Sequence, residues 1–175
     1  MRRAADAGRI SSFLATLGRQ APLDVDAYLT GGATAVLIGW RASTIDVDVW
    51  FDPDDDRLLR LLPALKEELE INIELASPAD FIPPLPGWRD RRISVDRYGR
   101  VTAYHYDPYA QALSKIERGH EQDRIDVAEL VGRGLVEPER ALDLFAAIEP
   151  DLFRYPAIDP PTFRRKVEAA FGRRL

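Results

Sequence analysis

The segment from Ile45 to Phe51 constrains the fold of this chain most, because apolar and polar side chains alternate along it. It reads Ile-Asp-Val-Asp-Val-Trp-Phe. Successive side chains of a β-strand point to opposite faces, so this period of two predicts a strand that is buried on one face only. Pro53 follows and ends the strand, because proline has no N–H for the ladder. Asp46 and Asp48 are therefore expected to project together from the face opposite the core.

Periodicity and turn residues predict other elements around this strand. Leucines at helical spacing predict one helix from a cap at Asp54 or Asp55 to about Leu69. Residues 77–88 contain four prolines and are expected to form a loop. The remaining elements expected in this part are helices over 3–18 and 33–38, strands over 27–29 and 71–75, and a hairpin of 92–96 with 101–106.

The chain is expected to become all-helical after Pro108. Pro138 and Pro161 stand where a first helical turn tolerates proline. The helices predicted here span about 109–118, 121–132, 138–148 and 161–171. This order indicates an α+β fold, with a small mixed β-sheet and flanking helices over residues 1–107 and a helical bundle over 108–175. The Asp46/Asp48 strand is expected near the middle of the sheet.

Composition excludes several classes of protein. The 175 residues contain no cysteine, which excludes disulfides, thiolate metal sites and cysteine nucleophiles. Two histidines without cysteine make a zinc site an unfavourable reading. A net charge of −5 does not fit a protein that binds polyanions over its whole surface. Charges interrupt the first 20 residues before any long apolar run, so we expect a cytoplasmic protein without a membrane span.

Asp46 and Asp48 are the first candidates for chemistry. Residues two apart on a strand lie roughly 6.6 Å apart, and two ionised carboxylates at that distance repel each other. A cation that neutralises them is the simplest reason for such a pair. Oxygen ligands suit Mg²⁺, which commonly takes one or two carboxylates together with substrate phosphates.

Gly31 and Gly32 provide a second element of the same site. They follow a predicted strand, open a predicted helix, and precede Asp46 by a short segment. Backbone without side chains lets phosphate oxygens approach N–H groups there. A phosphate site and a metal site would then lie side by side, as phosphoryl or nucleotidyl transfer requires.

The segment from Leu29 to Phe51 resembles the signature of the nucleotidyltransferase superfamily, in which Gly-Gly or Gly-Ser is followed by alternating hydrophobic residues and aspartates. A later segment, Leu113 to Leu130, resembles the lysine and Asp-x-x-Asp helices of AbiEii-type and MenT-type toxins from bacterial toxin–antitoxin pairs. The resemblance implies a nucleotidyltransferase-like fold, Mg²⁺ as cofactor and an NTP as substrate. It also implies tRNA or another macromolecule as acceptor and a cognate antitoxin as partner.

The resemblance also implies a role for each matching residue. Gly31 and Gly32 would bind the triphosphate through backbone amides, and Asp46 and Asp48 would hold Mg²⁺. Lys115 would contact nucleotide phosphate, and Asp123 or Asp126 would supply a further carboxylate. These last two lie three apart on a predicted helix and share one face. Residues that remain open are Glu74 and Asp80 as alternative third carboxylates, and Arg41 as a phosphate or acceptor contact.

Several further residues have ordinary structural readings that we prefer. His105 is expected to be packed or on the surface, His120 to cap a helix end, and Trp50 to pack in the core rather than stack on a base. The arginines between Arg89 and Arg100 alternate with aromatic residues, which suits RNA contact, and Arg91 and Arg92 are the first candidates. A second basic cluster runs from Arg164 to Arg174.

The sequence therefore predicts a Mg²⁺-dependent enzyme that transfers a nucleoside monophosphate from an NTP to an acceptor, with the role of a toxin acting on tRNA as the leading hypothesis. Two alternatives remain. One is an enzyme that modifies a small molecule, as antibiotic nucleotidyltransferases do. The other is a catalytically silent relative that binds nucleotide or RNA.

Overall fold

The computed structural model describes residues 2–172, and these form two compact units. The first unit contains the chain up to Ser77 together with Ile93–Tyr106. The second contains Pro78–Arg92 together with the chain from Asp107 onward. Each unit is described by itself.

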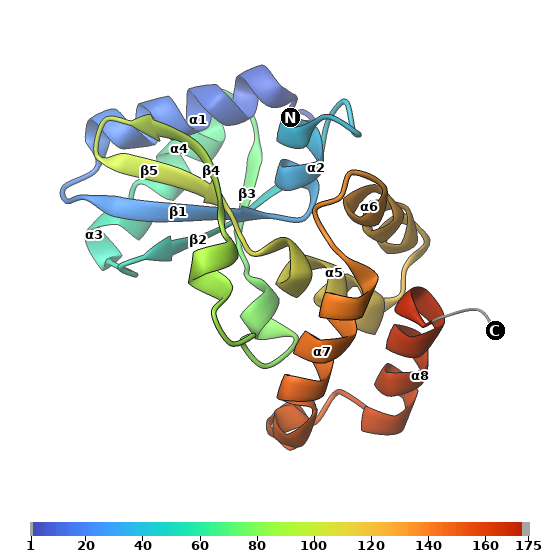
Figure 1. Cartoon of the computed structure of the whole chain (residues 1–175). Helices are drawn as coiled ribbons and strands as arrows, with labels where there is room; N and C mark the ends of the chain where they lie inside the picture. Colours follow the sequence, from blue (N-terminus) through green and yellow to red (C-terminus); the bar gives the residue numbers. More distant parts are fainter. Residues whose placement is uncertain (1, 173–175) are drawn as a thin grey trace. The chain divides into compact units, whose positions relative to one another are not determined.

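The first unit is built on one five-stranded mixed sheet, shown in Figure 1. Its order is β3-β2-β1-β5-β4, so β1 is central and the aspartate strand β2 lies inside the sheet between β1 and β3. Strand β2 is antiparallel to β1 and parallel to β3, β1 is parallel to β5, and β4 and β5 form an antiparallel hairpin. The strands are β1 (Val25–Thr30), β2 (Asp46–Asp52), β3 (Asn72–Leu75), β4 (Ile93–Tyr98) and β5 (Val101–His105).

Strand β2 confirms the prediction from alternation. Its inward side chains, Val47, Val49 and Phe51, are almost fully buried, while Asp46 and Asp48 are half-buried on the other face. Ile45 lies outside the strand and is 78% exposed. The strand is thus shifted by one residue from its predicted bounds.

Helix α1 (Ala7–Gln20) covers the apolar face of the sheet. Its predicted stripe of Ile10, Phe13, Leu14 and Leu17 is fully buried. The helix begins later than the predicted residue 3, because Ala5 forms a β-bridge with Thr44 and Asp6 accepts a hydrogen bond from the Arg9 N–H as the cap. A short second helix, α2 (Gly32–Ile38), starts at the predicted glycine pair.

The single helix predicted between Asp55 and Leu69 is wrong, because two helices lie there. They are α3 (Asp56–Leu59) and α4 (Leu62–Leu69). Pro63 stands in the first turn of α4, where proline is tolerated because a first-turn N–H has no helical partner. Pro63 could not continue a helix from Leu59, because proline disrupts a helix interior. The helical spacing of the leucines therefore continues across the break between α3 and α4. Asp55 is the cap of α3, as one of the two expected choices.

The second unit is helical, as predicted (Figure 1). Its α-helices are α5 (Pro108–Arg118), α6 (Glu121–Gly132), α7 (Pro138–Ile148) and α8 (Pro160–Phe171). The proline-rich stretch expected as a loop contains the short 3₁₀ turn η1 (Pro78–Asp80) and ends where η2 (Trp88–Arg91) begins. A third 3₁₀ turn, η3 (Glu149–Arg154), follows α7. Helix α8 packs mainly against α5 and α7, and it also contacts η3.

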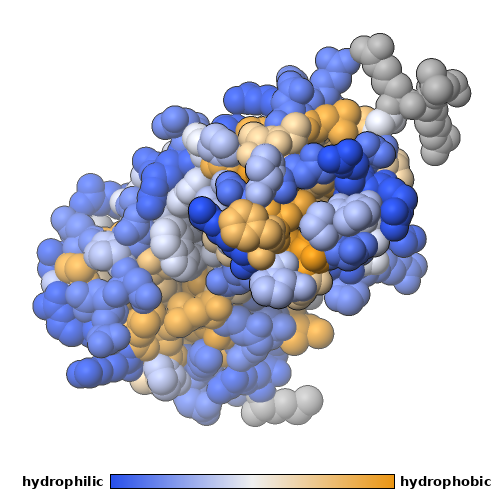
Figure 2. Space-filling view, turned by 90° about the horizontal axis from the view of Figure 1, so that it is seen from below, coloured by the Kyte–Doolittle hydropathy of each residue, from blue (hydrophilic) through white to orange (hydrophobic). Residues whose placement is uncertain are grey.

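Hydrophilic residues dominate the face of the molecule seen in Figure 2, and apolar residues gather there in a few patches. Large apolar side chains that remain exposed include Phe81, Ile125 and Phe153. No helix among the described residues has the length and apolar character needed to cross a membrane.

Candidate active site

The carboxylates of the first unit gather on two neighbouring parallel strands. Asp46 pairs in register with Asn72, and Asp48 pairs with Glu74, so all four side chains belong to the same face of the sheet. The Asn72 amide donates to Asp46 Oδ1 at 2.5 Å and to Glu74 Oε1 at 3.3 Å. Asn72 therefore links the aspartate strand to the carboxylate on β3.

The glycine turn lies directly against this group. Gly31 has φ 61° and ψ −129°, a conformation that side-chain-bearing residues rarely adopt. A Cβ added at Gly31 would lie 2.8 Å from Asp48 Oδ2. The absence of a side chain thus leaves the backbone of the turn open beside a carboxylate of β2.

The turn that precedes β2 completes this arrangement. A Cβ at Gly32 would lie 2.1 Å from the Thr44 hydroxyl and 3.3 Å from an Arg41 guanidinium nitrogen. Thr44 in turn donates to the Asp46 carbonyl at 2.9 Å. The structure therefore brings together five of the predicted site residues in the first unit, namely Gly31, Gly32, Arg41, Asp46 and Asp48.

His105 is a packed residue next to helix α2. It is 5% exposed, and its Nδ1 lies 3.0 Å from the Thr34 hydroxyl on α2. The Thr34 hydroxyl also forms a hydrogen bond with the Leu29 carbonyl, at 3.3 Å. Burial lowers the pKa of His105 to about 4, and the imidazole is neutral at pH 7. The preferred reading of His105 as packed is confirmed.

Glu74 is the third-carboxylate candidate that shares the face of Asp46 and Asp48, while Asp80 belongs to η1 of the second unit. Among the described residues, no three Asp, Glu or His side chains converge closely enough to form a metal site from protein ligands alone. Mg²⁺ suits such a partial set, because it is bound through one or two carboxylates and completes its shell with phosphate oxygens and water. The oxygen-only donors of Asp46 and Asp48 beside the open glycine turn fit that group.

Trp50 lies on the same face of β2 as the aspartates, and it is half-buried. Its ring centroid is 5.5 Å from that of Tyr28 on the neighbouring strand. Tyr28 also stacks on Tyr104, so Trp50 is part of an aromatic cluster that runs across three strands. Trp50 therefore packs against aromatic side chains, but the expected core position is wrong, because Trp50 lies on the face of β2 opposite the buried Val47 and Val49.

The other predicted site residues come together in the second unit. Lys115 Nζ donates to Asp126 Oδ2 at 2.7 Å and lies 3.6 Å from Asp123 Oδ1. All three side chains are almost fully buried, and Arg118 binds Asp123 at 2.6 Å. The sequence left Lys115 unplaced relative to the two aspartates, because Gly119 interrupts the helix. Gly119, with φ 71°, turns the chain so that α6 packs back on α5.

His120 is the N-cap of α6, as expected, and its N–H donates to the Asp123 carboxylate at 3.3 Å. Asp123 thus accepts hydrogen bonds from the backbone N–H of His120 and from Arg118. Gln122 donates to Asp126 at 3.1 Å. Lys115 and Arg118 of α5 thus bind the two aspartates of α6, and these bonds hold the two helices together.

The arginines expected to contact RNA differ in their environments. Arg91 is held by Asp107 through two bonds of 2.7 and 3.0 Å, and only 13% of its side chain is exposed. Burial raises the pKa of Asp107 above its usual value, although Arg91 acts in the opposite direction. Arg100 pairs with Asp24 at 3.0 Å. Arg92 is half-buried, whereas Arg89 and Arg97 are exposed, so Arg89 and Arg97 replace Arg91 and Arg92 as the first candidates for contact with a polyanion.

The second basic cluster is partly neutralised as well. Arg164 binds Glu149 at 2.5 Å. Lys166 donates to the Glu117 carbonyl at 2.8 Å, which satisfies the end of α5. Arg173 and Arg174, which the sequence placed in this cluster, lie outside the described residues.

A solved structure with a similar fold defines the class of fold. The crystal structure of an antigenic nucleotidyltransferase-like protein from Paracoccidioides brasiliensis superposes with a TM-score of 0.50 at 13% identity, over 98% of this chain and 100% of that chain. The fold is therefore nucleotidyltransferase-like. Among curated proteins, none matches this sequence.

A family model identifies the chain more closely. Residues 10–140 match the model described as "Nucleotidyltransferase of unknown function (DUF6036)". The match spans most of the chain, from α1 into α7, and the chain belongs to this family. The second motif resembles AbiEii-type and MenT-type toxins, but the family model does not place the chain in either group.

Proposed function

We propose that this protein is a Mg²⁺-dependent nucleotidyltransferase that transfers a nucleoside monophosphate from an NTP to an acceptor. The observation that carries the proposal is the placement of Asp46 and Asp48 on one face of β2, with Asp48 beside the open Gly31 turn. Family membership supports the general class of reaction. The two aspartates would hold Mg²⁺, which supplies neutralisation of the charge on the phosphate oxygens.

In the proposed reaction, an acceptor oxygen attacks the α-phosphorus of the NTP. The bond from that phosphorus to the bridging oxygen of the β-phosphate breaks, and pyrophosphate leaves. Gly31 and Gly32 would bind the triphosphate through their N–H groups, and Arg41 beside Gly32 would add a cationic contact. We assign Glu74, which pairs in register with Asp48, to accept the proton of the acceptor.

Lys115, Asp123 and Asp126 keep the roles that the resemblance implies, as proposals about the second unit. Lys115 would contact nucleotide phosphate, and the two aspartates would orient it. A buried lysine held by two buried carboxylates supports a functional reading, because such groups cost stability unless they are paired and positioned.

The direct test is transfer of label from α-³²P-labelled NTPs in the presence of Mg²⁺, with RNA, protein and small-molecule fractions as acceptors. We expect label on one fraction and release of pyrophosphate. Asp48→Asn should abolish both, while Asp52→Asn, at the far end of the same face of β2, should leave both intact. Equal turnover by the wild type and Asp48→Asn would overturn the metal assignment.

For the biological role, we propose a toxin that modifies tRNA and is countered by an antitoxin. The support is the likeness of the Lys115 and Asp123-x-x-Asp126 segment to the toxin motif. Induced expression should arrest growth, and Asp48→Asn should remove the arrest. Loss of the effect only when a neighbouring gene is coexpressed would identify the antitoxin.

A small-molecule acceptor is the second candidate. The observation that favours it is the engagement of Arg91 by Asp107 and of Arg100 by Asp24, which removes two arginines from the expected RNA contact. Label on a low-molecular-weight product, with none on RNA, would select this candidate.

A further inference from the structure

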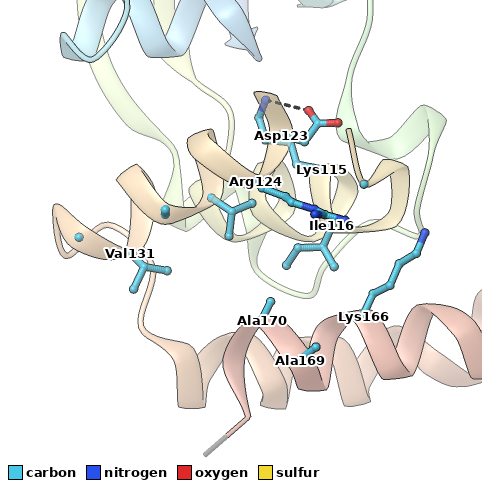
Figure 3. A pocket seen from close by; sticks show the side chains of 12 residues that line it. Lys115, Ile116, Asp123, Arg124, Val131, Lys166, Ala169 and Ala170 are labelled. Atoms are coloured by element: carbon cyan, nitrogen blue, oxygen red, sulfur yellow. Dashed lines mark ion pairs between the residues drawn. The ribbon is translucent and has the colours of Figure 1, made fainter. Parts of the chain in front are cut away.

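A pocket of about 680 Å³ opens within the second unit between α5, α6 and α8. Figure 3 shows Ile116 on α5, Val131 on α6, and Ala169 and Ala170 on α8 facing into it. With Val127, these side chains make the lining mainly apolar. No residue of the carboxylate group on the sheet belongs to this lining.

The charged groups of the lining are mostly cationic. Lys115, Arg124 and Lys166 line the pocket together with a single carboxylate, Asp123. That carboxylate is already bonded to Arg118 at 2.6 Å and lies 3.6 Å from Lys115. In Figure 3 the Arg124 guanidinium extends toward Ile116, and Lys166 rises from α8 at another side of the cavity. A cationic rim on an apolar cavity is notable in a chain of net charge −5.

From this arrangement we propose that the pocket binds a small amphipathic anion, a molecule with an apolar or aromatic body and one acidic group. The volume lies in the range of small-molecule sites, roughly 300–1,000 Å³. Such sites combine apolar walls with a few placed polar groups, as here. Arg124 would hold the acidic group, because guanidinium pairs well with carboxylate, sulfonate and phosphate oxygens. Lys166 would add a second positive charge from the opposite wall.

The same features exclude other occupants. Apolar side chains make up most of the walls, which does not suit a triphosphate with its many charged oxygens, and the volume fits one small molecule rather than an extended chain. The pocket shares Lys115 and Asp123 with the NTP contacts proposed for the second unit, but no residue of the Gly31, Asp46 and Asp48 site lines it, so this proposal does not depend on the proposed reaction.

The test uses two fluorescent probes that differ by one charge. 8-Anilinonaphthalene-1-sulfonate has the proposed chemistry, and N-phenyl-1-naphthylamine has the same rings without the sulfonate. The purified full chain should bind the sulfonate at one site, and more tightly than the neutral probe. Failure of the folded wild type to bind the sulfonate would overturn the proposal, as would equal affinity for both probes.

Matched variants locate the site. Ala170→Phe should fill the pocket and weaken both probes at least about tenfold, while Ala147→Phe, at an exposed alanine of α7 outside the lining, should change neither. Arg124→Gln and Lys166→Met should each weaken the sulfonate about threefold and leave the neutral probe unchanged, since exposed ion pairs contribute little.

Arg165→Gln, next to Lys166 but outside the lining, is the control for charge. Circular dichroism confirms that each variant is folded. If Ala170→Phe does not fold, Arg124→Gln and Lys166→Met still show whether the sulfonate binds in this pocket. Sulfonate binding that all the folded variants retain at wild-type strength would place the probe elsewhere and overturn the assignment.

Discussion

At the scale of single residues, chemistry at Asp46 and Asp48 depends on neighbours that leave room for it. Gly31 approaches Asp48 where no side chain could fit, and Thr44 occupies the space that a side chain at Gly32 would need. Asn72 holds Asp46 by one hydrogen bond and reaches Glu74 by another. The carboxylates are thus oriented by side chains that take no part in the proposed transfer.

Replacing Asp48 with asparagine should reduce nucleotidyl transfer at least about 100-fold, since even indirect partners of a catalytic metal change activity by about 10–100-fold. The free energy of unfolding should stay within about 1 kcal/mol, because the substitution removes repulsion between two carboxylates on one face. Urea denaturation and NTP turnover measured on the same preparation check both. Unfolding of the variant would assign Asp48 a structural role.

His105 should make the protein sensitive to acid. Its pKa is about 4 in the folded chain and 6.5 when unperturbed, so the unfolded state binds more protons between these values. Stability from the neutral histidine is therefore complete above pH 6.5 and is lost as the pH falls toward 4, by about 3 kcal/mol. His105→Gln lacks this titration and keeps a hydrogen-bonding group beside Thr34. The difference in unfolding free energy between wild type and variant should shrink over this window, and a constant difference would contradict the prediction.

At the scale of elements, the glycine turn, strand β2 and helix α2 form one unit of structure. Gly31 forms the N-cap of α2, and its backbone is strained for any other residue. The turn therefore fixes where the helix starts and how close Asp48 lies to it.

Gly31→Ala should destabilise the fold by about 1–3 kcal/mol and weaken NTP binding, because the new Cβ would lie 2.8 Å from Asp48 Oδ2 in a backbone conformation that alanine disfavours. Gly132→Ala is the control, since a Cβ there meets nothing within 4 Å. The control should be neutral or slightly stabilising at the end of α6. Thermal denaturation and calorimetry with NTP measure the two effects, and equal behaviour of both variants would argue against a special role for the turn.

The elements of this chain differ in how far sequence could predict them. Strand β2 was predictable because its alternation is local and one face is buried. The break between α3 and α4 carried a signal, Pro63, but leucines of helical period run across it and concealed it. The pairing of Lys115 with Asp126 had no local signal in the sequence, because it depends on how Gly119 returns the chain onto α5. Likewise, nothing local in the arginine-rich segment indicated that Asp107 would hold Arg91.

The buried pair between α5 and α6 allows a test of function against stability. Lys115→Met should cost about 3–5 kcal/mol, because it leaves the Asp126 charge buried without its cation. Adding Asp126→Asn should restore much of that loss. If Lys115 binds nucleotide phosphate, the double variant should be stable yet still bind NTP weakly by calorimetry. Wild-type NTP affinity in the stable double variant would make Lys115 a purely structural residue.

At the scale of the whole molecule, charge rather than shape separates the candidate acceptors. The chain carries 24 basic and 29 acidic side chains, so any attraction to a polyanion must come from local surfaces. Arg91 and Arg100 are paired with aspartates, and Arg164 with Glu149. Arg89 and Arg97 of the predicted RNA-binding segment are exposed, and they are therefore the ones to test.

Arg89→Gln and Arg97→Gln should each weaken binding to tRNA and reduce the dependence of log affinity on log salt by about 0.7–0.9, the change expected for one lost phosphate contact. NTP affinity should not change. Arg133→Gln, which removes an exposed arginine already bound to Glu129 at 3.0 Å, serves as the control and should leave the salt slope as in the wild type. Arg91 is unsuitable for this experiment, because its loss would leave Asp107 without its partner and confuse folding with binding. Parallel salt plots of equal affinity for all four proteins, or no binding of tRNA by the wild type, would remove these arginines from the acceptor surface and favour a small-molecule acceptor.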